Sequence, residues 1–234
     1  MAYRPQRMKF GAFFAPFHND RTNPTLALES DMDLIAYMDK LSFDEAWIGE
    51  HHSGAYECIA SPEIMIATVA ERTKHIRLGT GVSSLAYHHP LILADRIAQL
   101  DHQTRGRVMF GVGPGQLIAD AYMMGVNPAD LRRRMNESLA VLVKLLHGET
   151  VNMETDWFTL REARMHILPY QSPTVEIAVA SAISPTGQFG PDGSLAASRH
   201  ERPGRVGIEV EVVEREGLAA TDGRRTGLAR DTRH

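Results

Sequence analysis

Short apolar runs alternate with amphipathic helical patterns along the chain from Met8 to about residue 187. The runs are mostly continuous, which is typical of strands that are covered on both faces. Strands separated by helical segments indicate repeated βα units and a parallel sheet. Residues 151–160 alternate between apolar and polar and predict an inserted β-hairpin. The predicted sheet strands are residues 8–14, 46–48, 75–84, 107–115 and 174–181.

Helices are predicted between these strands by apolar residues spaced three to four positions apart. Three of them begin at or just after Pro24, Pro62 and Pro90. The clearest pattern begins near Asn127 and stops before Gly148. Its buried stripe consists of Leu131, Met135, Leu139, Leu142 and Leu146.

The composition changes abruptly beyond Phe189, where aromatic residues, Lys, Met and Asn are absent and Gly, Ala, Arg and Glu are frequent. Only residues 205–216 keep an alternating pattern, enough for a single strand. We therefore divide the chain into a barrel-type portion, residues 1–187, and an atypical tail, residues 188–234. The tail is expected to be disordered, or to derive from coding DNA read in a shifted frame, because its residues are those of GC-rich codons.

Five predicted βα units indicate an α/β fold of the (β/α)8 TIM-barrel type that is incomplete, because an intact barrel needs eight such units. An open barrel leaves a sheet edge exposed. We therefore expect the chain as written to be poorly soluble or inactive.

Composition points to one soluble domain that acts on small molecules. The chain has 234 residues, 43% of them hydrophobic, with a formal net charge of −4. This balance gives no electrostatic indication of nucleic acid or an acidic membrane surface. Without a long apolar segment or a cleavable leader, we expect a cytoplasmic protein. Cys58 is the single cysteine and is interpreted as a thiol without a role.

Polar residues follow each predicted strand, and such positions carry the chemistry in parallel barrels. Glu50, His51 and His52 place a carboxylate beside two imidazoles whose rings must point to opposite sides of an extended chain. Histidine suits general acid or base catalysis, with Glu50 orienting a ring, but ordinary hydrogen-bonded histidines would look the same. A metal site that adds His88 and His89 is not expected, since no thiolate or helical histidine pair supports it.

Two further segments suggest ligand contacts without deciding them. Gly111 and Gly113 match the start of a dinucleotide fingerprint, but Gln116 occupies the third glycine position, so that interpretation is rejected. These glycines would let backbone approach a flat ligand, or merely allow a tight turn. Ser181 and Ser184 could line a phosphate-binding turn or a plain polar loop.

The ordered blocks "MKFGAFF", "EAWIGEHH", "GTGV", "HHP", "GRVMFGVGPG" and "RMNESLAVL" resemble the bacterial luciferase-like flavin-dependent monooxygenases. The resemblance covers residues 8 to about 187. The segments "APFH", "NPTLA" and "AISPTG" are most similar to the limonene monooxygenase branch. The resemblance to the family implies a barrel that binds reduced FMN at the carboxyl-terminal ends of its strands.

The resemblance also implies roles for individual residues. His51 would lie beside the flavin and be catalytic, with Glu50 orienting it. The bond between Gly81 and Val82 would be a non-proline cis peptide under the flavin ring. Gly113 stands where luciferase has a reactive cysteine, so light emission is not implied. The implied cofactor-binding residues are Ala15, Gly81, Val82, Ser83, Gly113, Ser181, Ser184 and Arg134.

The activity implied by the resemblance is transfer of one oxygen atom from O2 to an apolar small molecule, such as a terpene. Reduced FMN would come from an NAD(P)H-dependent flavin reductase, and members of the family are often dimeric. Two alternatives stay open. The chain could be a deazaflavin (F420)-dependent oxidoreductase, because users of that cofactor share the barrel, or a truncated flavin-binding or inactive remnant.

Overall fold

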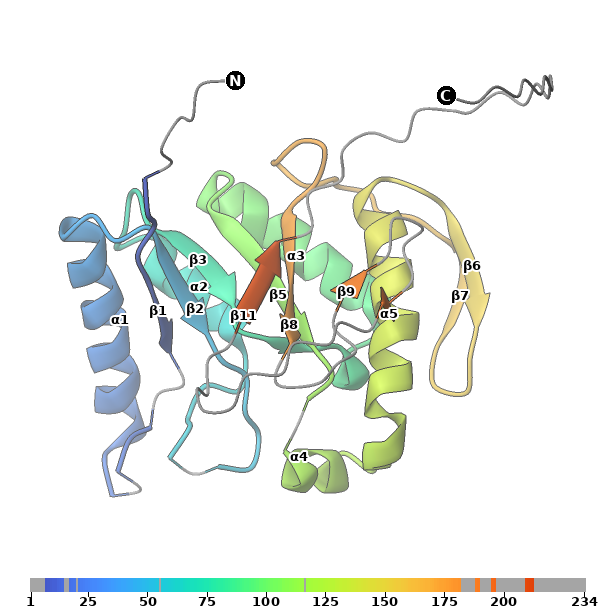
Figure 1. The fold of residues 1–234 in the computed structure, drawn as a ribbon, viewed down its shortest axis with the longest axis horizontal. Helices are drawn as coiled ribbons and strands as arrows, with labels where there is room; N and C mark the ends of the chain where they lie inside the picture. Colours follow the sequence, from blue (N-terminus) through green and yellow to red (C-terminus); the bar gives the residue numbers. More distant parts are fainter. Residues whose placement is uncertain are drawn as a thin grey trace, which may run out of the picture.

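One mixed sheet with helices packed against it organises the chain in the computed structural model (Figure 1). The sheet has seven strands in the order β1-β2-β3-β5-β8-β11, with β4 paired to β5. The structure describes residues 7–14, 17–19, 21–54, 56–115, 117–181, 188–189, 195–196 and 209–212.

The strands of the sheet are short. They are β1 (Gly11–Phe14), β2 (Glu45–Ile48), β3 (Arg77–Thr80), β4 (Ser83–Ser84), β5 (Val108–Gly113), β8 (Glu176–Ser181) and β11 (Glu209–Val212). Two hairpins lie outside it, formed by β6 (Val151–Glu154) with β7 (Thr159–Ala163) and by β9 (Gln188–Phe189) with β10 (Leu195–Ala196). The helices are α1 (Pro24–Lys40), α2 (Pro62–Ala70), α3 (Pro90–Thr104), α4 (Ile118–Met123) and α5 (Leu131–Leu146), with 3-10 turns η1 (Leu85–Tyr87) and η2 (Pro128–Asp130).

The five predicted strands are present as β1, β2, β3, β5 and β8, and they pair in parallel in chain order. Ala46 of β2, for example, stands opposite Leu78 of β3. Parallel strands joined by helices confirm the predicted α/β architecture of the TIM-barrel type. β11 falls within the segment 205–216, where one strand was predicted, and it runs antiparallel to β8. Most of the predicted tail lies outside the described residues, so the domain boundary at 187 stays a prediction.

The sequence placed α1, α2, α3 and α5 correctly because each is preceded by a recognisable start signal. Proline occupies the first turn of α1, α2 and α3. The side chain of Asn127 accepts a hydrogen bond from the N–H of Ala129 and starts η2, which leads into α5. Gly148 follows α5 with a φ of +83°, a conformation that glycine adopts without a steric penalty. Among the described helices, none is long and apolar enough to cross a bilayer.

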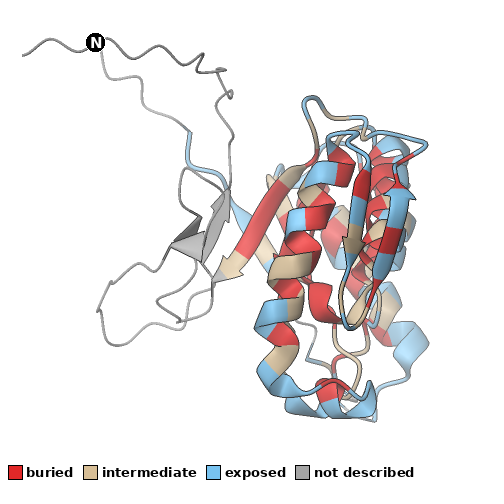
Figure 2. Ribbon diagram, turned by 90° about the vertical axis from the view of Figure 1, so that its right-hand side faces the viewer, coloured by how far each residue is buried: buried red, intermediate tan, exposed pale blue. Residues whose placement is uncertain are grey.

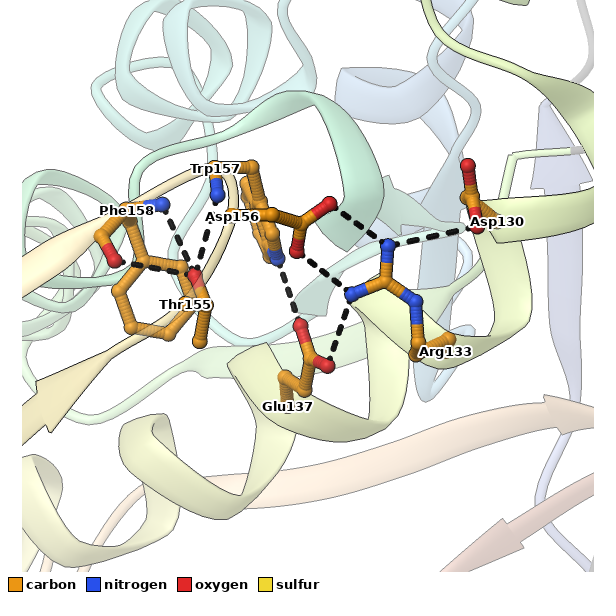
Figure 3. Close-up of polar contacts among 7 residues, drawn as sticks. All are labelled: Asp130, Arg133, Glu137, Thr155, Asp156, Trp157 and Phe158. Atoms are coloured by element: carbon orange, nitrogen blue, oxygen red, sulfur yellow. Dashed lines mark hydrogen bonds and ion pairs between the residues drawn. The ribbon is translucent and has the colours of Figure 1, made fainter.

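The predicted insertion is the hairpin β6–β7, which lies against α5 at one side of the molecule (Figure 1). Arg133 of α5 binds both carboxylate oxygens of Asp156 in the hairpin turn, at 2.7 and 2.9 Å (Figure 3). Nε1 of Trp157 donates to Glu137 at 2.7 Å. These contacts tie the hairpin to α5.

The two faces of the sheet carry different side chains. The face toward the helices bears large apolar residues, such as Ile48, Leu78 and Phe110, each at most 1% exposed. Buried residues accordingly follow the strands and the inner sides of the helices (Figure 2). The other face has a small separate cluster made of Trp47, Met109 and Ala178.

Candidate functional site

A cavity of about 290 Å³ lies on this second face, at the carboxyl ends of the parallel strands. Its volume is at the small end of the range for ligand pockets. Apolar side chains and glycines dominate the wall, with few polar groups among them. The lining residues are Phe13, Trp47, Glu50, His51, Thr80, Gly81, Val82, Ser84, Gly111, Gly113, Pro114, Gly115, Leu117, Asp120, Ala178 and Ala180.

Glu50 holds two histidines at the base of this site. Its side chain is fully buried, and Oε1 accepts hydrogen bonds from Nε2 of His52 at 2.8 Å and of His88 at 3.0 Å. Oε2 accepts the backbone N–H of Ser84 at 3.0 Å. The carboxylate therefore joins the loop after β2 to the segment after β3.

These contacts shift the pKa values of Glu50 and His52. Burial by itself would raise the pKa of Glu50, but the hydrogen bonds from His52 and His88, the charge of His88 and the N–H of Ser84 lower it to about 2. The hydrogen bond to Glu50 raises the pKa of His52, against the opposing effect of burial. At neutral pH Glu50 is thus an anion that its partners satisfy.

His51 lines the cavity, as expected. The prediction that Glu50 orients the His51 ring was wrong, because Glu50 binds His52 instead. The carboxylate neighbour of His51 is Glu57, with Nδ1 of His51 3.2 Å from Oε2 of Glu57. The two atoms are close enough for an ion pair, although their alignment is not that of a hydrogen bond. Residues two apart on an extended chain share a side, which is why Glu50 reaches His52 and not His51.

Asp120 and Tyr87 are polar residues near this cavity that the sequence analysis did not find. Asp120 lies in the first turn of α4 and is 3% exposed. Its Oδ2 accepts the N–H of His52 at 3.3 Å, whereas Oδ1 is buried without a partner among the described residues. Burial, together with the charges of Asp120 and Glu50, raises the pKa of Tyr87 to about 12. A six-residue helix after a glycine turn is too short to show a pattern, so the sequence gave no signal for a buried carboxylate.

The glycines of the cavity wall are required by packing within the protein. A Cβ at Gly111 would stand 1.9 Å from the carbonyl oxygen of Thr80, and one at Gly113 would stand 2.6 Å from Cγ2 of Val82. Both distances are below any ordinary contact. The sequence left two explanations open, close approach of a ligand or the geometry of the chain itself. The contacts with Thr80 and Val82 already account for these two glycines without a ligand.

Some of the predicted cofactor residues line the cavity, some lie elsewhere in the structure, and some fall outside the described residues. Gly81, Val82 and Gly113 line the cavity, and the peptide bond between Gly81 and Val82 is cis, as the resemblance implied. Ser83 does not line it. That residue is fully buried with its hydroxyl unpaired among the described residues, while the adjacent Ser84 faces the cavity.

The predicted phosphate contacts are not assembled in the described part of the chain. Arg134 is not among the lining residues, and its guanidinium lies over the ring of Trp157, 5.2 Å from the centroid. Arg134 therefore faces the hairpin, because Trp157 lies in the turn between β6 and β7. Ala15 and Ser184 lie outside the described residues, and Ser181 is described only as the last residue of β8.

Comparison with known proteins agrees with this geometry. Residues 8–219 match the family described as luciferase-like monooxygenase. The chain is 50% identical to limonene 1,2-monooxygenase of Rhodococcus erythropolis over 181 residues, which are 77% of this chain and 46% of that protein. It is 49% identical to 4-hydroxyprotoasukamycin monooxygenase of Streptomyces nodosus subsp. asukaensis over 78% of this chain and 49% of that protein. The chain thus spans about half the length of these relatives.

Relatives differ in the cofactor that their names record. The oxygenating constituent of 3,6-diketocamphane monooxygenase from Pseudomonas putida, solved with FMN, superimposes with a TM-score of 0.69 at 26% identity over 74% of this chain and 51% of that chain. An F420-dependent glucose-6-phosphate dehydrogenase of Amycolatopsis mediterranei is 26% identical over 64% of this chain and 48% of that protein. Family match, sheet topology and the cavity at the strand ends agree, and this chain belongs to the luciferase-like monooxygenase family.

Proposed function

We propose that the chain is the flavin-binding portion of an FMN-dependent monooxygenase that inserts one oxygen atom from O2 into an apolar small molecule. The observation that carries the proposal is the cavity beside His51, where two buried polar atoms have no hydrogen-bond partner among the described residues and stand among apolar walls. These atoms are Nδ1 of His51 and Oδ1 of Asp120, both buried.

The residues present fit a flavin ring, which is flat and has one apolar edge and one polar edge. Phe13, Trp47 and Val82 supply apolar surface. Asp120 supplies an acceptor for an N–H group, and it stays unsatisfied unless a ligand or water reaches it. Reduced FMN, when bound, would supply the electrons that activate O2, and O2 is the source of the oxygen atom that is transferred.

The protein's own residues would exclude water from the reaction and transfer a proton. Apolar lining residues exclude water, which would otherwise waste the reduced cofactor. His51 stands at the wall with Glu57 on one ring nitrogen, so it can hold or release a proton at the other nitrogen. The anion of Glu50 fixes His52 and His88 and thereby keeps the loop that carries His51 in place.

The proposed substrate is an apolar ring compound of the terpene class, on the strength of the 50% identity to limonene 1,2-monooxygenase. An NAD(P)H-dependent flavin reductase would deliver the reduced FMN. A deazaflavin-dependent oxidoreductase is the second candidate, which the F420-dependent relative supports. A chain that binds flavin without turnover is the third, because it spans about half of its relatives.

The test combines binding with turnover. The purified full chain is titrated anaerobically with reduced FMN and, separately, with reduced deazaflavin. It is then supplied with a flavin reductase, NADH, limonene and isotopically labelled O2, and the product is analysed for the label.

The proposal requires binding of FMN rather than deazaflavin and one labelled oxygen in the product, in contrast to the inactivity that an open barrel predicts. His51→Gln should lower the product yield while FMN still binds, and His75→Gln, at a histidine outside the cavity lining, should leave both unchanged. Preference for deazaflavin would replace the proposal with the second candidate. FMN binding without labelled product would leave the flavin-binding remnant.

A further inference from the structure

We propose that His18, Asp31 and Cys58 form a binding site for a zinc-class divalent cation, separate from the cavity. His18 lies in the loop after β1, Asp31 in α1 and Cys58 in the loop after β2. Their ligand atoms all lie within 4.8 Å of one another. Nε2 of His18 stands 2.9 Å from Oδ2 of Asp31.

The donor set selects the type of cation. An imidazole nitrogen, a carboxylate oxygen and a thiolate sulfur together match Zn²⁺ and Co²⁺, whereas Mg²⁺ and Ca²⁺ take oxygen donors. The residues are sheltered, with Asp31 6% exposed and the other two half-buried. Three protein ligands would leave a fourth position for water.

The geometry needs only a small closure. In a tetrahedral zinc site a sulfur and a nitrogen stand about 3.6 Å apart, given bonds of about 2.3 and 2.1 Å. The thiol of Cys58 must therefore approach the other two donors by no more than about 1.2 Å. Both His18 and Cys58 lie in loops and not in helices or strands of the sheet.

These loops already contact each other around the proposed site. The N–H of His18 donates to the carbonyl of Tyr56 at 2.8 Å. The rings of Phe17 and Tyr56 stack with centroids 5.7 Å apart, and Phe17 forms a bridge with Glu57. A bound cation would add a fourth contact between the two loops.

The site has a consequence for the cavity because Cys58 directly follows Glu57. Oε2 of Glu57 is the neighbour of the His51 ring, and the N–H of His51 donates to the carbonyl of Ile59 at 3.0 Å. A cation held by Cys58 would therefore restrain both flanks of the segment that positions His51. The competing interpretation is a hydrogen-bonded His18–Asp31 pair beside an unconnected thiol.

Cobalt binding decides between the two interpretations. The full chain, purified without a histidine tag and stripped of metal with a chelator, is titrated with Co²⁺ at neutral pH. Because Cys58 is the single cysteine, a thiolate-to-cobalt charge-transfer band can report only this site. We expect the band to saturate at one Co²⁺ per chain and to disappear when Zn²⁺ is added.

Variants separate this site from other histidines on the surface. Zn²⁺ affinity, measured by competition with a chelating dye, should fall at least tenfold in His18→Gln and in Cys58→Ser. Asp33→Asn, which removes an exposed carboxylate from the same helix, should keep the parent affinity. Circular dichroism without metal checks that each variant is folded. Absence of the band, or parent affinity in His18→Gln and Cys58→Ser, would overturn the proposal.

Discussion

The two faces of one sheet differ in the size of the side chains they carry, and that difference creates the site. Along β5, Phe110 and Val112 point toward the helices, while Met109, Gly111 and Gly113 belong to the other face. Along β8, Val179 faces the helices and Ala178 the cavity. Large residues fill one face to close packing, whereas on the other face Gly111, Gly113 and Ala178 leave room beside Trp47 and Met109. Stability and ligand binding are therefore assigned to opposite sides of the same strands.

The helix-covered face should dominate stability. Phe110→Ala removes a ring that is 0% exposed, and we expect the free energy of unfolding to fall by about 3–5 kcal/mol. Phe13→Ala, on the cavity face, removes a ring that is 43% exposed and should cost less than about 1.5 kcal/mol. Urea denaturation measures both. Equal losses would remove the distinction between the two faces.

Glu50 is the exception on the cavity side, because its buried charge is structural. Glu50→Gln leaves His52 and His88 without their anion and should cost about 3 kcal/mol at pH 7, while the exposed Glu149→Gln should cost little. The pKa of Glu50 is lowered from 4.5 to about 2, so its contribution is present above pH 4.5 and is lost as the pH falls toward 2. The stability difference between parent and variant should shrink over that range. A difference independent of pH would contradict this assignment.

Gly111 tests the claim that strand packing fixes the glycines. A Cβ there would meet a backbone atom of Thr80, which cannot rotate away, so Gly111→Ala should cost about 1–3 kcal/mol. Gly54→Ala is the control, because its nearest neighbour would be 3.5 Å away. Thermal melts compare the two. If Gly111→Ala is as stable as the parent, the explanation from packing fails.

His52 should give the smallest effect. Its pKa is raised above 6.5 by the hydrogen bond to Glu50, so its contribution to stability is complete below pH 6.5 and is lost as the pH rises through the raised pKa. The parent should therefore lose some stability above pH 6.5, and His52→Gln should lack that loss. Denaturation at several pH values measures it, and identical pH profiles would refute the role of His52.

Sequence predicted the architecture because it depends on local patterns. Continuous apolar runs and proline at helix starts are visible in the chain, and each marks an element that the structure contains. The break that divides the predicted strand 75–84 into β3 and β4 was not predicted, and α4 is too short to show a period. Strand-end position also located Glu50 and His51 correctly at the cavity.

Most of the contacts that Glu50 and His51 make could not be predicted from the sequence. Glu57 reaches His51 through a loop, and His88 reaches Glu50 from 38 positions away, so no local pattern links them. The pairing of Glu50 with His52 was readable, since residues two apart on an extended chain share a side. The stacking of Arg134 on Trp157 could not be predicted either, because a free arginine and a stacked one look alike in sequence.

The most direct test of the central claim is the fluorescence of Trp47 during an anaerobic titration with reduced FMN. Trp47 lines the cavity and Trp157 contacts α5, so Trp157→Phe leaves Trp47 as the only tryptophan. We predict saturable quenching at one FMN per chain. Emission that does not change as FMN is added would contradict a flavin site on the small-residue face of the sheet.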